Sequence, residues 1–276
     1  PKWNPDRKEK LSEPQPLTIF AVQEIDRLMV LIKVIRSTCS DLKLALDGQI
    51  IMTTKLQDTL DYVSDARVPP HWVAVSWPSP TVSSWFGDVI KRRDQLTNWA
   101  TYGRPPMYWF PGFFNPQGFL TSVQQEISRR QTWALDRVDQ RSDVLTEMRN
   151  HDNERDSKVS APTDGSVHIW GLFLDGCAWD KAARKMKEAI TSTAELFKEM
   201  PIIHVYATSS DSKADAGALK DMGRGKKQGP TLKYKCPVYK YPNRTMNHWV
   251  TDFDLPCDEG DAAWRMKGVS LLLSTD

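Results

Sequence analysis

The feature that most constrains the fold is a change in hydrophobic spacing near residue 132. Before that point, apolar residues recur every three or four positions, which is the period of an α-helix. After it, short runs rich in β-branched and aromatic residues are separated by Gly, Pro and Asp turns, which is typical of strands. The sequence therefore predicts an α+β protein with an extended lead-in over 1–16, a helical subdomain over 17–131 and a strand subdomain over 132–276.

The strand subdomain is expected to be an antiparallel, barrel-like structure. Its runs are not each followed by a crossover helix, as a parallel sheet would require. A helix over 180–200 is expected to interrupt the strands, and a long loop is expected over 209–230. The expected strands cover 137–144, 167–174, 202–207, 232–239, 249–253 and 264–273.

The first helix, predicted over 17–36, is apolar on two sides. The broader side is expected to face the core and comprises Val22, Ile25, Leu28, Met29, Ile32 and Ile35. Val30, Leu31 and Val34 project to the opposite side, near Arg27. A helix that is apolar on two sides is usually covered on both. Arg27, Val30, Leu31 and Val34 therefore form a candidate docking surface for a partner, with a loop of the same polypeptide as the alternative cover.

Further helices are predicted from their end signals. Short ones cover 41–46 and 54–66, a longer one is capped by Thr81 or Ser79 and ends at Gly103, and another has Asn115 as its N-cap. Three adjacent cations, Lys91, Arg92 and Arg93, are interpreted as a solvated face or a docking patch.

Charge and hydropathy exclude some partners. Lys and Arg number 37 against 35 Asp and Glu, so the net charge of +2 gives no strong field to attract nucleic acid or an anionic membrane. The longest apolar run, 28–32, is far shorter than the roughly 18 residues of a membrane span. We therefore expect neither a nucleic-acid nor a membrane partner, and a soluble intracellular protein. The start at Pro1 suggests a piece of a longer polypeptide.

No motif for catalysis or cofactor binding is evident. The chain lacks a P-loop, a Gly-x-Ser-x-Gly elbow and a Cys-x-x-Cys pair, and its 5 histidines occur singly. The sequence predicts a non-catalytic domain without cofactor or metal. Two alternatives stay open: a domain that uses some of its 11 tryptophans to bind carbohydrate or another small ligand, and a hydrolase centred on His168, His204 or His248.

Several segments are unusual enough to indicate a family. They are 109–121 (WFPGFFNPQGFLT), 171–180 (GLFLDGCAWD), 234–240 (YKCPVYK) and 264–273 (WRMKGVSLLL). Together, and in this order, they resemble the C-terminal domain of dynein heavy chains. Segments 47–52, 65–69 and 133–136 are further similar to the axonemal outer-arm branch of γ type. The motif residues expected to be structural are Trp109, Gly112, Phe113, Phe114, Asn115, Pro116, Gln117, Gly118, Phe119, Gly171, Trp179, Cys236, Pro237, Trp264 and Gly268.

The resemblance implies a helical part followed by a β-barrel that lies across the ring of AAA+ modules in the same heavy chain. There it would brace the ring and modulate motility, without catalytic residues of its own. It implies that ATP, Mg and microtubules are bound elsewhere in the parent protein, and that the partners are the AAA+ ring, other dynein chains and microtubules. The implied location is cytoskeletal, in the axoneme of a cilium or flagellum. Residues 180–200, 209–230 and 241–249 depart from the family pattern.

Overall fold

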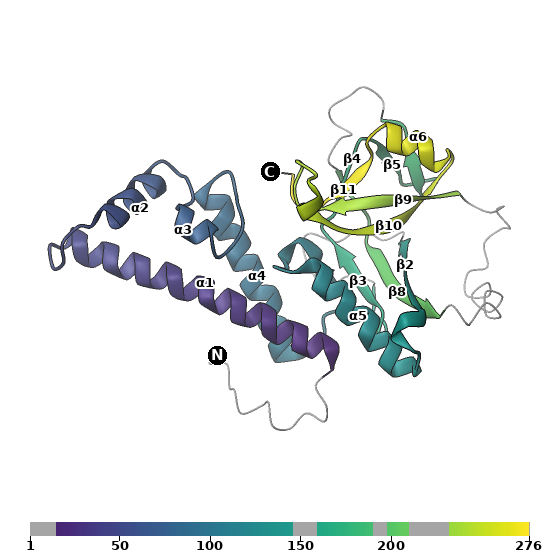
Figure 1. Ribbon diagram of the computed structural model, residues 1–276, viewed down its shortest axis with the longest axis horizontal. Coiled ribbons are helices and arrows are strands. Elements are labelled where there is room, and N and C mark those ends of the chain that lie inside the picture. The colour runs from purple at the N-terminus through teal and green to yellow at the C-terminus, as the bar shows by residue number, and fades with distance from the viewer. Residues whose placement is uncertain (1–14, 146–158, 190–197, 210–231, 276) are drawn as a thin grey trace.

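The computed structural model describes residues 15–145, 159–189, 198–209 and 232–275, with helices first and strands after them (Figure 1). The α+β prediction is confirmed. Helices α1 to α4 lie on one side of the molecule, the sheets lie on the other, and α5 lies between them (Figure 1). Residues 1–14 of the expected lead-in, and nearly all of the expected loop over 209–230, lie outside the described residues. The main helices are α1 (Pro16–Leu46), α2 (Thr54–Ser64), α3 (Pro70–Val73), α4 (Val82–Tyr102) and α5 (Pro116–Gln131).

Helix α1 is one continuous helix, so the prediction of two helices over 17–36 and 41–46 was wrong. The intervening Ser and Thr residues are poor helix formers that often compete for backbone hydrogen bonds. Here Thr38 is instead fixed within the helix, because its hydroxyl donates to the carbonyl of Val34 at 2.8 Å. The same oxygen accepts the indole N–H of Trp72 at 3.4 Å. A tertiary contact thus stabilises a stretch that is weakly helical by itself.

The predicted helix starts at Thr81 and Asn115 are confirmed. The hydroxyl of Thr81 accepts the N–H of Ser84 at 3.1 Å, and the side-chain oxygen of Asn115 accepts the N–H of Gly118 at 3.1 Å. Gly103 ends α4 with φ of +87°, a backbone conformation that favours glycine. None of the described helices combines the length and apolar character needed to cross a lipid bilayer. Short 3-10 helices cover Phe110–Gly112, Leu135–Arg137 and Met246–His248.

The described strands form separate sheets and do not close into a barrel. One sheet has the order β1-β3-β8-β2, a second has the order β10-β9-β11-β4-β7, and β5 pairs with β6 alone. Most pairs are antiparallel as predicted, but β1 with β3 and β11 with β9 are parallel. The strands are β1 (Tyr108–Trp109), β2 (Val138–Val144), β3 (Val167–Trp170), β4 (Phe173–Asp175), β5 (Ala178–Asp180), β6 (Lys185–Lys187), β7 (Lys198–Glu199), β8 (Ile203–Ser209), β9 (Leu232–Tyr239), β10 (Trp249–Cys257) and β11 (Ser270–Leu272).

Two sequence predictions in this half were wrong. The expected helix over 180–200 is a β5–β6 hairpin followed by β7 in its described part, while 190–197 lie outside the described residues. The hairpin turn forms because the carboxylate of Asp180 accepts the N–H groups of Ala182 and Ala183, both at 2.9 Å. The expected strand over 264–273 begins instead as helix α6 (Asp261–Met266), which buries Trp264 to 1% exposure before β11 starts.

One hydrophobic core continues through both halves of the molecule. It runs from Leu17 in α1 to Leu273 after β11. Helix α5 contacts α1 on one side and β2, β8 and β10 on the other. At its centre the rings of Phe113 and Phe119 stack with centroids 4.5 Å apart, and Phe20 of α1 meets Phe113 edge-on at 5.1 Å. The two predicted subdomains therefore share their apolar interior.

Candidate functional site at the junction of helices and strands

The most unusual sequence segment, 109–119, forms the junction between the two halves. Its first residue, Trp109, belongs to β1, which pairs in parallel with β3 so that Trp109 lies opposite Trp170. β1 is an edge strand. Gln95 of α4 covers this edge: its side-chain oxygen accepts the N–H of Trp109 at 2.6 Å, and its amide nitrogen donates to the carbonyl of Trp109 at 3.2 Å. A covered edge cannot pair with another strand.

Glu24 of α1 holds the next part of the junction. Its carboxylate is 1% exposed and accepts the N–H of Phe114 at 2.6 Å and the N–H of Asn115 at 3.2 Å. Burial raises the pKa of Glu24, while the two backbone hydrogen bonds and the nearby charge of Arg27 act in the opposite direction. This buried carboxylate connects the first helix to irregular backbone some ninety residues later in the sequence. Sequence analysis missed it, because nothing in a helical pattern distinguishes a buried Glu from an exposed one.

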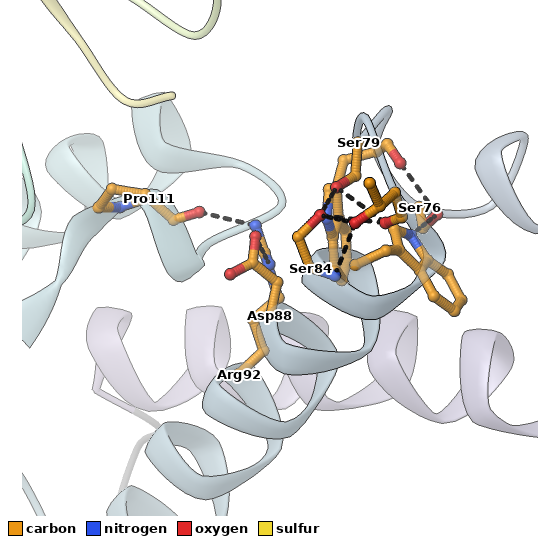
Figure 2. A network of polar contacts seen from close by, with 9 residues as sticks. Ser76, Ser79, Ser84, Asp88, Arg92 and Pro111 are labelled. Carbon is orange, nitrogen blue, oxygen red and sulfur yellow. Dashed lines mark hydrogen bonds and ion pairs between the residues drawn. The ribbon is translucent and has the colours of Figure 1, made fainter. Parts of the chain in front are cut away.

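Arg92 of α4 holds the middle of the junction, as Figure 2 shows. Its guanidinium donates to the carbonyl of Pro111 at 2.9 Å and lies 3.4 Å from the carboxylate of Asp88, one turn earlier on α4. The group also lies over the ring of Trp77, 3.5 Å from its centroid, which is a close cation–π contact. Burial lowers the pKa of Arg92 to about 10, although Asp88 counteracts this. The interpretation of residues 91–93 as a solvated face was therefore wrong for Arg92, which is 6% exposed, whereas Lys91 and Arg93 are exposed.

Two glycines allow the backbone to approach closely at the junction. A Cβ atom at Gly112 would lie 2.5 Å from Cε3 of Trp109. Gly171 has φ of +90°, and a Cβ there would lie 2.8 Å from Cδ1 of Trp109 and 2.9 Å from Cδ of Pro111. Both positions need glycine because the ring of Trp109 fills the space between them.

The segments that carry the resemblance meet in space, although they are far apart in the sequence. Segment 109–121 contacts 171–180 at Gly171, which lies against Trp109 and Pro111, and β1 pairs with β3 directly before that segment. Segment 264–273 contributes β11, which pairs with β4 of 171–180 and with β9 of 234–240. Lys240 then returns to the junction, where its ammonium donates to the carbonyl of Phe114 at 3.3 Å. The sequence suggested these segments individually, but only the fold shows that they form one assembly.

The remaining motif residues have structural surroundings. Phe113, Phe119, Pro116, Cys236 and Trp264 are buried, and the indole N–H of Trp264 donates to the carbonyl of Glu259 at 3.2 Å. Phe114, Asn115, Gly118, Trp179 and Pro237 are partly buried, whereas Gln117 and Gly268 are exposed. Gly268 has φ of +65°, and its carbonyl accepts a hydrogen bond from Arg244 at 2.5 Å. Arg244 also forms an ion pair with Asp175 of β4.

Comparison with known proteins identifies the family of this protein. The family model that describes the C-terminal domain of the dynein heavy chain matches residues 2–273. The protein belongs to this family. It is 38% identical to mouse dynein axonemal heavy chain 5 over 268 residues, which cover 97% of the present sequence and 5% of that protein. It is 38% identical to human dynein axonemal heavy chain 8 over 264 residues, covering 95% and 5% of the two sequences.

A flagellar relative bears on the predicted branch. The sequence is 33% identical to the gamma chain of the flagellar outer arm dynein of Chlamydomonas reinhardtii, over 98% of its own length and 6% of that protein. The predicted similarity to axonemal dyneins is thus confirmed. The present sequence spans only about a twentieth of the length of these dynein heavy chains.

The docking surface predicted on α1 of this dynein domain is only partly exposed. Val30 is 55% exposed, and the side chain of Arg27 is 52% exposed, 3.6 Å from the carboxylate of Glu24. Leu31 is completely buried and Val34 packs against the core, so neither belongs to a free surface of the domain. Met29, which was expected in the core, is instead 54% exposed. The face that α1 buries is therefore shifted by about one residue from the predicted face. Glu24, Leu28 and Leu31 all lie on the buried face.

His204, one of the histidines expected at a hydrolase site, lies in a hydrogen-bonded chain with Ser166 and Asp164 of the dynein domain. His204 Nε2 lies 2.8 Å from the hydroxyl of Ser166, which lies 2.5 Å from the carboxylate of Asp164. Hydrogen bonding to Ser166 helps to lower the pKa of Asp164, against its burial, so the carboxylate is an acceptor only. Ser166 must donate to it and accept from His204 Nε2–H. A ring nitrogen that already carries a proton cannot remove one from Ser166, which is also 4% exposed.

Other candidate chemistry is not assembled by the fold. His168 lies near His204, with ring centroids 5.1 Å apart, whereas His248 is bonded to Asn243 and Thr245. Within the described ranges, no group of three or more His, Cys, Asp or Glu side chains is placed to hold a metal ion. The tryptophans mainly pack in the core: Trp72, Trp77, Trp85, Trp99, Trp170 and Trp264 are all at most 9% exposed. This does not support a carbohydrate platform of exposed tryptophans.

Proposed function

We propose that this protein is a non-catalytic regulatory domain that packs on the AAA+ ring of its own dynein heavy chain and modulates motility. The family supports a place at the C-terminus of an axonemal heavy chain. The parent protein would bind ATP, Mg and microtubules elsewhere, associate with other dynein chains, and work in the axoneme of a cilium or flagellum. The domain itself would need no cofactor, and its strands would complete a barrel-like body.

The observation that carries the docking proposal is the exposed apolar pair Met29 and Val30 on α1. These side chains are 54% and 55% exposed in the middle of α1, whereas the other exposed large apolar residues of this helix, Ile19 at 41% and Leu46 at 61%, lie near its two ends. Arg27, one turn before Val30 and Leu31, borders the pair with a cation. An apolar spot bordered by charge on a rigid helix suits a protein contact. The revised docking surface is therefore Arg27, Met29 and Val30.

The experiment uses the intact heavy chain with Met29→Asp and Val30→Asp together. A carboxylate buried without a partner at a contact costs several kcal/mol, about 3 or more, so we expect a changed gliding velocity or ATPase rate. The matched control is Met246→Asp with Met266→Asp, because these methionines are 86% and 89% exposed in the strand half. Unchanged motor behaviour in the α1 variant, with the control also unchanged, would show that α1 does not dock through this surface.

A further inference from the structure

A cleft of about 390 Å³ opens at the junction and is shared by both halves of the molecule. Helix α4 and the loop before it form one wall, segment 109–116 forms the floor, and the ends of β3, β9 and β11 form the other wall. This volume lies within the range of ligand-binding clefts. The site has walls that are positioned by the contacts of Arg92, Glu24 and Lys240 described above.

More cationic than anionic side chains line the cleft. Its cations are Lys91, Arg92 and Lys240, and its carboxylates are Asp88 and Glu199. The carboxylate of Asp88 forms an ion pair with the guanidinium of Arg92 at 3.4 Å, and Glu199 also interacts with another group. The ammonium of Lys91 lies over the ring of Trp109, 5.4 Å from its centroid, and that of Lys240 donates to the Phe114 carbonyl. Neither lysine forms an ion pair with a described carboxylate.

Buried donors in the same walls also lack acceptors. Nε of Arg92 and Nε1 of Trp77 are buried and have no hydrogen-bond partner among the described residues. Both residues line the cleft and are more than nine-tenths buried, with exposures of 6% and 8%. Buried polar groups without partners are uncommon in folded proteins. Burial also lowers the pKa of Lys240, although the nearby carboxylate of Glu24 acts in the opposite direction, and a further carboxylate in the cleft would raise this pKa again.

We propose that an acidic segment of the parent heavy chain, from outside these residues, enters this cleft and places an Asp or Glu carboxylate against Lys91 and Lys240. The inference rests on the proposed docking and names a second contact for it. The partly exposed ring of Phe114, which lines the cleft, contacts the apolar part of such a segment. A free multivalent anion fits less well, because Asp88 and Glu199 line the same cleft and repel several negative charges more strongly than the single charge of one carboxylate.

The test is carbodiimide cross-linking of the intact heavy chain, followed by peptide mass spectrometry. This reagent joins an amine only to a carboxylate in direct contact. We expect Lys91 or Lys240 to be joined to an Asp or Glu of the heavy chain outside residues 1–276. Replacing both by arginine keeps the charge and should abolish these products, while cross-links of the exposed Lys267 to Glu188 and Glu259, at 2.6 and 2.9 Å, persist as an internal control.

The outcomes separate this inference from the docking proposal. If the control cross-links form but Lys91 and Lys240 give no product outside the domain, the cleft is not a docking site. The α1 proposal would then still stand, provided that the variant at Met29 and Val30 alters motility. If instead the cross-links form and that variant has no effect, the cleft is a contact and the α1 surface is not.

Discussion

In the helical half, buried and half-buried polar side chains hydrogen-bond to irregular backbone, whereas in the strand half the backbone is held by hydrogen bonds between the strands. Glu24, Arg92 and Gln95 each bond to main-chain atoms of 109–115 across the interior. In contrast, β9 and β10 pair over almost their whole length, around a core that includes Cys236, Val238 and Leu255. The junction therefore depends on a few side-chain contacts, whereas the sheets distribute their stability over many similar backbone hydrogen bonds.

The largest effect should come from Trp85→Ala, which tests whether the helical half and the strand half unfold together or separately. Trp85 is fully buried and stacks on Trp72 with centroids 5.3 Å apart. Truncation of such a ring costs about 3–5 kcal/mol. Because the core is continuous, circular dichroism and tryptophan fluorescence should still report one urea transition at a lower midpoint. Trp249→Ala, at a 38% exposed site, is the milder control. Two separated transitions would contradict a shared core.

A smaller effect is expected from Gly171→Ala, which tests the junction itself. The substitution combines a positive φ with contacts below 3 Å to Trp109 and Pro111. Left-handed backbone and overpacking together cost about 2–4 kcal/mol. Gly260→Ala is the matched control, since φ there is −64° and a Cβ would have open space. Thermal unfolding measures both variants, and equal melting temperatures would contradict the close approach at the junction.

The smallest effect concerns the pH dependence of stability. A group in the helical half and a group in the strand half should change the free energy of unfolding in opposite directions as the pH rises. Burial raises the pKa of Glu24 above 4.5, so its contribution to stability is present below pH 4.5 and is lost as pH rises through the raised pKa. Burial lowers the pKa of His204, against the influence of Asp164 and Asp143, so its contribution is present above pH 6.5 and is lost as pH falls through the lowered pKa.

Single variants separate these two contributions to the pH dependence of the free energy of unfolding. Relative to the unchanged protein, Glu24→Gln should flatten the loss of stability on raising the pH, and His204→Gln should flatten the loss on lowering it. Urea unfolding at a series of pH values measures both. The same change of slope in both variants, or none in either, would contradict the assigned environments.

Sequence reasoning succeeded where local chemistry decides the structure. The N-caps at Thr81 and Asn115, the end of α4 at Gly103 and most strands follow from residue types and spacing. It failed where a distant contact overrides local preference. Thr38 is kept helical by Trp72, Asp180 closes a hairpin turn in place of a helix, and Trp264 is buried on a short helix. The same holds for the candidate site. The motif predicted the importance of Trp109, whereas no local pattern predicted that Glu24 would be buried.

The sequence by itself determined the fold class, the change from helices to strands near residue 132 and membership of the dynein C-terminal domain family. These depend on periodicity and on short motifs, which are local properties of the polypeptide. Only the tertiary structure decided that Leu31 faces inward, that Arg92 is buried and that segments 109–121 and 234–240 meet around one cleft. The physical reason is that burial and pairing depend on which distant residues compete for the same space, and spacing along the sequence does not record that.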